Sequence, residues 1–190
     1  DLFGASRGGG GNFGVATRFL YRLQPVDTVV GGMLRLPATP EVIASFVEAA
    51  SGAPEELSAI INIMAAPPMP FVPEEHHGEL IVMALVVYAG PVEESEKVLA
   101  PFRALAPPIV DMLKPMPYPE MFAGQEEFRP LAVGRTLFLD TVDRDVAATI
   151  LDRIRASSAM MAITQISAKD GATASVTDET NELEHRRNMY

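Results

Sequence analysis

Apolar residues recur at two spacings along this chain of 190 residues. An alternating pattern or a short continuous apolar run is typical of strands, and such segments lie at 13–23, 28–36, 57–66, 79–89, 131–140, 159–168 and 172–177. Spacings of three and four residues are typical of amphipathic helices, and they follow Thr39, Pro91 and Asp143. A short helix is also predicted near 118–123, within a segment, 108–130, that is otherwise predicted to be irregular.

Polar caps, prolines and glycines set the expected ends of the helices. Thr39 is predicted as an N-cap, with Pro40 in the first helical position and Gly52 at the end. Asp143 is predicted to cap a helix that runs to about Ser157. The core-facing positions of that last helix are expected to be Val146, Ile150 and Ile154.

The order of these elements predicts an α+β fold, in which an antiparallel β-sheet is covered by helices on one face. Gly31-Gly32 predicts a bulge or a close approach of backbone in the second strand, and Lys169-Asp170-Gly171 predicts a hairpin turn between the last two strands. The glycine-led segment 1–26 lacks helical spacing and differs in this from the rest of the chain. We therefore expect a domain boundary near Pro25, with residues 1–26 pairing outside this sequence and residues 27–190 forming a second domain, truncated at its C-terminus.

Composition narrows the possible functions. The chain has 25 acidic and 15 basic residues, a formal charge of −10, which argues against nucleic-acid binding because phosphate contacts need clustered lysine and arginine. It has no cysteine, so disulfides, thiolate metal sites and a cysteine nucleophile are excluded for these residues. No apolar run reaches the length of about 18 residues that a membrane span needs, so we expect no membrane partner. We also expect a cytoplasmic location.

A glycine cluster at 8–14 is the strongest local motif. Gly9-x-Gly11-x-x-Gly14 matches the dinucleotide fingerprint, but that fingerprint requires a helix after it, and here a strand is predicted. Glycines without side chains also let the backbone touch a flat or anionic ligand closely. A flexible linker is the alternative interpretation.

The other candidate groups are interpreted as surface or packing residues. The pair His76-His77 is interpreted as part of a solvated loop, and His185 with Arg186-Arg187 as a surface group paired with nearby glutamates. The methionines of the irregular segment are interpreted as core filler or pocket lining, and no metal site is predicted; they are Met112, Met116 and Met121.

Several motifs together carry a family resemblance, in order along nearly the whole chain. They are Asp1-Leu2-Phe3, the segment 7–15 (RGGGGNFGV), Leu23-Gln24-Pro25-Val26, Gly31-Gly32-Met33, Tyr88-Ala89-Gly90-Pro91, Pro115-Met116-Pro117-Tyr118 and His185-Arg186. The sequence resembles the FAD-linked oxidases, in particular the berberine-bridge-enzyme-like branch of the vanillyl-alcohol-oxidase family. The resemblance covers the last strand of the FAD-binding domain and then the substrate-binding domain.

This resemblance implies a cofactor and a reaction. In the family, FAD lies between an FAD domain and a substrate domain whose sheet covers the isoalloxazine ring. The flavin takes a hydride from an alcohol, amine or sugar and passes the electrons to oxygen. The residues that would lie along the FAD are Gly8, Gly9, Gly10, Gly11, Asn12 and Gly14, and the residues that would face a small-molecule substrate are Gln165, Ser167 and Tyr118.

The sequence also departs from the family pattern. Gly4 replaces a tryptophan, Ser6 replaces an apolar residue, and Ser167 stands where many members carry a catalytic acid. Because serine is a poor general base without an activating group, the catalytic base is not assigned. The family's flavin-linking residues and pyrophosphate loop lie outside this sequence, so we expect the chain alone to bind FAD weakly or not at all.

Two other interpretations remain open. One is a flavin-free α+β module that binds a ligand or forms a homo-oligomer. The other is a homologue that keeps the fold without the activity, indicated by Gly4 and Ser167. The apolar composition of the expected pocket favours an aromatic or polyketide-like substrate, with a sugar as the alternative.

Overall fold

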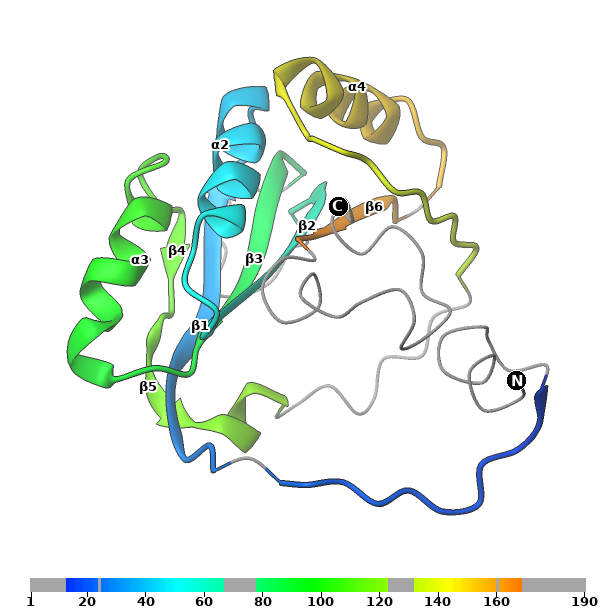
Figure 1. Ribbon diagram of the computed structural model, residues 1–190. Coiled ribbons are helices and arrows are strands. Elements are labelled where there is room, and N and C mark those ends of the chain that lie inside the picture. Colours follow the sequence, from blue (N-terminus) through cyan, green and yellow to red (C-terminus); the bar gives the residue numbers. More distant parts are fainter. Residues whose placement is uncertain (1–12, 24, 67–77, 123–131, 160, 169–190) are drawn as a thin grey trace.

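A sheet of six antiparallel strands forms the centre of the molecule (Figure 1). The structure is a computed structural model that describes residues 13–23, 25–66, 78–122, 132–159 and 161–168. The strand order is β4-β1-β3-β2-β6, and β5 also pairs with β1. The strands are β1 (Thr28–Pro37), β2 (Leu57–Ala65), β3 (Leu80–Tyr88), β4 (Val110–Asp111), β5 (Lys114–Pro117) and β6 (Ile163–Ser167).

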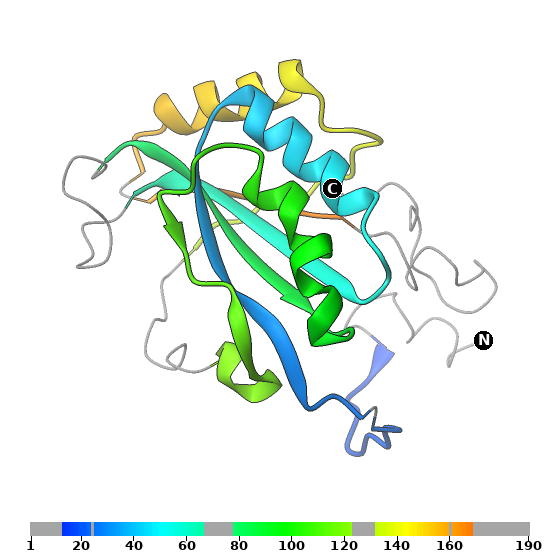
Figure 2. The same ribbon diagram turned by 90° about the vertical axis from the view of Figure 1, so that its left-hand side faces the viewer.

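Three helices pack against one face of this sheet, as Figure 2 shows from the side of α3. They are α2 (Pro40–Ser51), α3 (Ser95–Arg103) and α4 (Arg144–Arg155); the short 3-10 turn η3 (Val92–Glu94) precedes α3. The backbone N–H of Val42 donates to Thr39 Oγ1 at 3.2 Å, and Asp143 Oδ1 accepts from the N–H groups of Asp145 and Val146. These contacts confirm both predicted N-caps.

The space between helices and sheet holds one main hydrophobic core. Phe46 of α2 and Phe102 of α3 meet edge to face, with ring centroids 5.0 Å apart. In α4 the fully buried residues are Ala147 and Leu151, and the predicted stripe is partly buried beside them. The sheet contributes the other alternating side chains of this core: Val30, Leu34, Leu36, Ile61, Ile63, Val82, Ala84, Val86 and Ile166.

The observed architecture confirms the α+β class, with the helices on one face of an antiparallel sheet. The strands predicted at 28–36, 57–66, 79–89 and 159–168 are present, as is a short 3-10 helix, η4 (Tyr118–Phe122). The strand predicted at 172–177 and its hairpin turn lie outside the described residues. Residues 1–12 lie outside them too, so the domain boundary near Pro25 remains a prediction.

Two predicted strands are not formed within this chain. Residues 13–23 and 132–140 form no strand, and the exposed fraction is 90% for Val15 and 96% for Val133. An alternating pattern predicts a half-buried strand, but a strand forms only where a neighbouring strand accepts its backbone hydrogen bonds. Conversely, the segment predicted to be irregular contains β4 and β5, two short strands on the outer side of β1.

Gly31 and Gly32 confirm the predicted close approach, without a bulge, since the β1–β3 register runs unbroken through both. A Cβ on Gly31 would lie 2.8 Å from Sδ of Met121. A Cβ on Gly32, whose φ is +145°, would collide with the carbonyl oxygen of Met112. Gly31 therefore makes room for η4, and Gly32 makes room for the chain that joins β4 to β5.

We predict that Gly32→Ala lowers the free energy of unfolding by about 2 to 3 kcal/mol, because backbone cannot move aside as a side chain can. Gly31→Ala should cost less, since the Met121 thioether can rotate away. Gly134→Ala is the control, because a Cβ there meets nothing within 4 Å. Urea denaturation of the three variants checks this order, and equal stability of Gly32→Ala and Gly134→Ala would refute it.

Tyr88 ends β3 with a ring that is 2% exposed. Burial, and then the negative charges of Glu94 and Glu56, raise the pKa of the Tyr88 hydroxyl above its ordinary value of 10.0. The folded state therefore favours the protonated phenol. This contribution to stability is complete below about pH 10 and is lost as pH rises toward the folded pKa.

Tyr88→Phe should accordingly weaken the loss of stability at alkaline pH. The urea midpoint of the unchanged protein should fall more between about pH 8 and about pH 11 than that of the variant. Tyr21→Phe provides the control, because the Tyr21 side chain is 74% exposed. If Tyr88→Phe and the unchanged protein lose stability in parallel, the buried phenol is not the group responsible.

Candidate functional site

The second face of the sheet, opposite the three helices, holds the predicted substrate-facing residues of β6. Gln165 and Ser167 share this face, as their separation by two residues predicts. Strand register places Gln165 beside Asn62 of β2, and Ser167 beside Ile60. Two rows of side chains can be followed across the strands on this face: Arg35, Met83, Asn62, Gln165, and next to it Met33, Leu85, Ile60, Ser167.

Most of these side chains are less buried than those on the helical face. Ile60 is 37% exposed and Ile163, at the β6 end of the next row, is 48% exposed, whereas Ile61 and Ile63 on the helical face are almost completely buried. The second face thus offers aliphatic and thioether surface together with a few polar groups. Such a mixture is typical of sites for small organic molecules.

Asn62 and Gln165 are joined across the strands by a side-chain hydrogen bond. Gln165 Nε2 donates to Asn62 Oδ1 at 3.2 Å, between residues that are 103 positions apart in the sequence. The bond fixes the two amides relative to each other on adjacent strands. Ser167 adds a hydroxyl, both donor and acceptor, in the neighbouring row.

Arg35 lies at the β1 end of the same row and is 1% exposed. Its Nε donates to Sδ of Met33 at 3.2 Å. Burial lowers the pKa of its guanidinium from the ordinary value. The Arg35 guanidinium thus lies buried at this face, and Met83, in the strand between them, separates Arg35 from Asn62.

Tyr118 lies at a different corner of this face. It is the first residue of η4, its N–H donates to the carbonyl of Asp27, and its ring meets that of Phe122 edge to face at 5.4 Å. Tyr118 follows β5, four strand spacings from β6, and lies opposite Asp27, six residues from the row of Ser167. From strand spacings, it is therefore roughly 19 Å from Ser167 across the strands and roughly 20 Å along them. The structure therefore brings Gln165 and Ser167 together but does not bring Tyr118 to them.

The η4 helix bounds one end of the second face. Its Met121 is 8% exposed and lies against Gly31, which shares the face with Met33 and Arg35. The Tyr118 and Phe122 rings remain 40% and 51% exposed beside it. Met121 is therefore a packing residue, as the sequence predicted. The rings of Tyr118 and Phe122 form an aromatic rim beside it.

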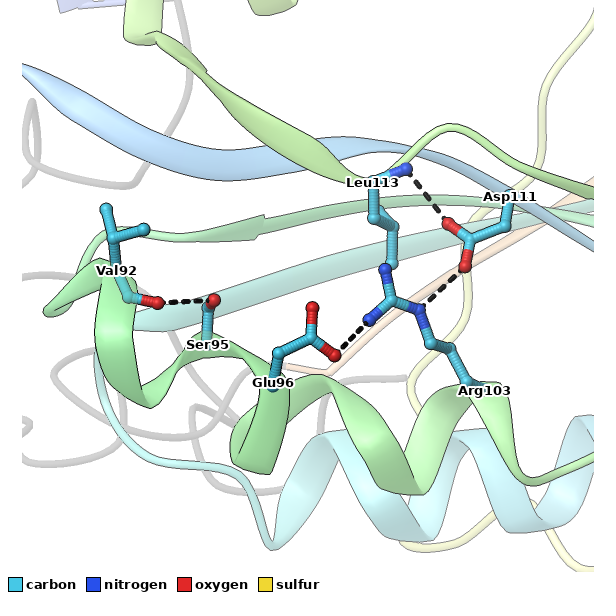
Figure 3. A network of polar contacts seen from close by, with 6 residues as sticks. All are labelled: Val92, Ser95, Glu96, Arg103, Asp111 and Leu113. Carbon is cyan, nitrogen blue, oxygen red and sulfur yellow. Dashed lines mark hydrogen bonds and ion pairs between the residues drawn. The ribbon is translucent and has the colours of Figure 1, made fainter.

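An ion-pair network holds the segment that leads to this rim (Figure 3). Arg103, in the last turn of α3, donates through Nε to Asp111 Oδ2 at 2.6 Å and through Nη1 to Glu96 Oε2 at 2.9 Å. The other oxygen of Asp111 accepts from the N–H of Leu113 at 3.0 Å. The hydrogen bond from Arg103 to Asp111, more than any other cause, raises the pKa of Arg103.

The predicted FAD-contacting residues are not tested by this structure. Gly8, Gly9, Gly10, Gly11 and Asn12 lie outside the described residues. Gly14 has a φ of +152°, and a Cβ on it would meet nothing within 4 Å. Contact between this segment and FAD thus stays a prediction.

A cleft of about 500 Å³ lies on the helical side, between α2 and the start of α4. Its lining includes Ser45, Glu48 and Asp143, and Asp143 already caps α4. None of the predicted site residues borders it. The candidate site is therefore assigned by the chemistry and register of the second face, not by this hollow.

Sequence reasoning missed Asn62 and Arg35. Each is the one polar residue within an apolar run, 59–66 for Asn62 and 29–38 for Arg35, and this signal could have marked both as candidates. Their position in one row with Gln165 required the pairing of four strands, which the sequence pattern does not give.

The described residues include no group of three or more His, Asp and Glu side chains placed to bind a metal. His76-His77 and His185 with Arg186-Arg187 lie outside the described residues. Among the described helices, none has the length and apolar character needed to cross a membrane.

The chain is similar to a known flavoprotein-class relative over part of its length. The chain is 30% identical over 125 residues, 64% of its length, to an FAD-linked oxidoreductase of Dictyostelium discoideum. The matched region spans 25% of that protein, so this chain corresponds to about a quarter of its relative. No protein-family model matches the chain.

The ion-pair network predicts an order of importance among its two carboxylates. Asp111→Asn should lower the free energy of unfolding by about 1 kcal/mol, because Asp111 binds both Arg103 and a backbone N–H. Glu96→Gln should change it by less than about 0.3 kcal/mol, since the Glu96 side chain is 82% exposed. Urea denaturation in low salt and in about 1 M salt tests this, and the Asp111 effect should shrink in salt. A larger effect of Glu96→Gln would show that the network is assigned wrongly.

Proposed function

We propose that this chain is the substrate-binding domain, preceded by the last strand of the FAD-binding domain, of an FAD-linked oxidase of the berberine-bridge-enzyme-like branch. The observation that carries the proposal is the position of Gln165 and Ser167. The family resemblance assigns both to the substrate, and both lie on the sheet face that the helices leave uncovered. The 30% identity to an FAD-linked oxidoreductase supports the same class.

The second face suits a flavin ring and a substrate by its chemistry. Bound FAD would accept a hydride from an alcohol, amine or sugar-type substrate and pass the electrons to oxygen. Gln165 and Ser167 would bind and orient the substrate through amide and hydroxyl groups. Tyr118, at the aromatic rim, would contact only a ligand long enough to reach it. These roles are positioning roles, since neither a serine nor an amide is a good proton acceptor near neutral pH.

Residues 1–26 would complete the FAD-binding domain. The exposed apolar side chains between 13 and 23 support this part of the proposal, because a folded protein rarely leaves such a row uncovered. Gly8 to Gly11, Asn12 and Gly14 would lie along the cofactor, and the open space around Gly14 leaves room for it.

A flavin-free α+β module that binds a ligand or oligomerises is the second candidate. One observation favours it: the sheet and three helices of the described part bury a single core among themselves. In that case the apolar part of the second face would take a ligand or a second copy of the chain without any redox chemistry.

Expression of the complete reading frame separates the two candidates. We expect a yellow protein with the visible absorption bands of oxidised flavin. Gly14→Val should lower the flavin content severalfold, since the added side chain would occupy space that the cofactor needs. Gly134→Val controls for the added side chain, because a Cβ on either glycine would have nothing of this chain within 4 Å, and the backbone strain that Gly14→Val adds through its φ of +152° is followed by the melting temperature. Melting temperatures of both variants show whether any loss of flavin reflects unfolding.

A folded, colourless protein would refute the oxidase proposal and favour the module. Equal flavin content in Gly14→Val and Gly134→Val would refute the assignment of Gly14 to the cofactor. Turnover of candidate alcohols by the yellow protein, followed by bleaching of the flavin absorbance, distinguishes an active oxidase from a homologue that has lost activity.

A further inference from the structure

Two methionines on the second face have sulfur atoms in different chemical environments. Met33 lies on β1, two residues before Arg35, and Met83 lies on β3, directly opposite Arg35 in the strand register. Both methionines are partly exposed and project from the same face of the sheet. The same small molecules in solvent therefore reach both, and the two residues differ in the partner of each sulfur.

The sulfur of Met33 accepts a hydrogen bond from a cation. Arg35 Nε donates to Met33 Sδ at 3.2 Å, and because Arg35 is 1% exposed, water has little access to this donor. Within the described part of the chain, no group donates a hydrogen bond to the sulfur of Met83. One thioether thus shares a lone pair with a guanidinium, and the other keeps both lone pairs.

This difference affects the reaction of a thioether with hydrogen peroxide. The sulfur lone pair attacks one peroxide oxygen, the S–O bond forms as the O–O bond breaks, and the departing hydroxide takes the proton of the transferred hydroxyl. The products are a sulfoxide and water, so sulfur loses the two electrons that peroxide gains. Sulfur becomes partly positive on the way. A hydrogen bond to its lone pair and a cation held against it therefore both oppose the reaction.

We propose that Met83 is the methionine of the second face that hydrogen peroxide converts to methionine sulfoxide, and that Arg35 protects Met33 from the same reaction. The proposal goes beyond the proposed oxidase, since it concerns peroxide from any source. An oxidase that passes two electrons to oxygen would form peroxide beside this face, and Met83 would then be modified by a product of the enzyme.

The row that contains Met83 also offers a polar partner for the oxidised side chain. Asn62 is the neighbour of Met83 on β2, and its amide NH2 can donate to a sulfoxide oxygen. A hydrogen bond of this kind offsets the cost of placing a polar oxygen among aliphatic and thioether groups. Oxidation of Met83 would thus make this row polar from Arg35 to Gln165.

The oxidation rates of individual methionines test the proposal on the purified protein from the complete reading frame. The protein is treated with excess hydrogen peroxide at neutral pH, and the sulfoxide at each methionine is followed by peptide mass spectrometry. We expect Met83 to be oxidised about fivefold faster than Met33, the factor that corresponds to one hydrogen bond. Met112, which is 50% exposed, gives the rate of an accessible thioether.

Substitutions of Arg35 link this difference to the hydrogen bond. Arg35→Leu should raise the oxidation rate of Met33 about fivefold and that of Met83 by less than about twofold, because only Met33 loses a donor. Arg35→Gln is the matched control. Its amide nitrogen stands as many bonds from Cα as Nε of arginine does, so it can still donate and should keep most of the protection.

Melting temperatures of both variants distinguish loss of folding from loss of protection. An unfolded variant would oxidise Met33 and Met83 together at the rate of Met112, and the decision then rests on the unchanged protein. Equal rates of Met33 and Met83 in the unchanged protein refute the proposal. Slow oxidation of Met33 in a folded Arg35→Leu variant refutes it as well. Because the peroxide is added, neither result affects the oxidase proposal, which the flavin spectrum of the same samples tests separately.

Discussion

Burial of the helical face of the sheet is the constraint on which the rest of the structure depends. Leu34, Ile61, Ala84 and Ile166 come from four strands and share one core with α2, α3 and α4. Because side chains alternate along a strand, fixing these residues inward fixes their neighbours on the other face. A slip of one residue in β6 would exchange Ile166 for Gln165 or Ser167 in the core. The apolar packing on one side therefore also positions the polar groups on the other.

Helix caps and close backbone contacts could be predicted from the sequence, but the pairing of distant strands could not. Thr39 and Asp143 could be predicted as caps because a cap needs only the three residues after it. The sequence predicted a close approach of backbone at Gly31-Gly32. It did not predict that Met112 and Met121 are the residues that come close. The alternating residues at 13–23 predicted a strand, yet the described chain supplies no neighbour that would make it one.

In the candidate site, too, sequence spacing predicted local features and the strand pairing had to come from the structure. The resemblance placed Gln165 and Ser167 on one strand face, and their spacing of two residues is enough for that. Asn62 became part of the site only through the β2–β6 register, which connects positions 103 residues apart. Tyr118 was grouped with these residues by family order, whereas the fold sets it at the far corner, next to Phe122. Sequence order thus identified candidates, and topology decided which of them are neighbours.

The outer border of β1 has a consequence for self-association. An uncovered strand edge can pair with the same edge of another molecule and so begin aggregation. Here β5 lies along that border, and two of its four residues, Pro115 and Pro117, have no backbone hydrogen to offer to an incoming strand. With Lys114 adding a charge, this side of the sheet is a poor template for growth of the sheet from one molecule into the next.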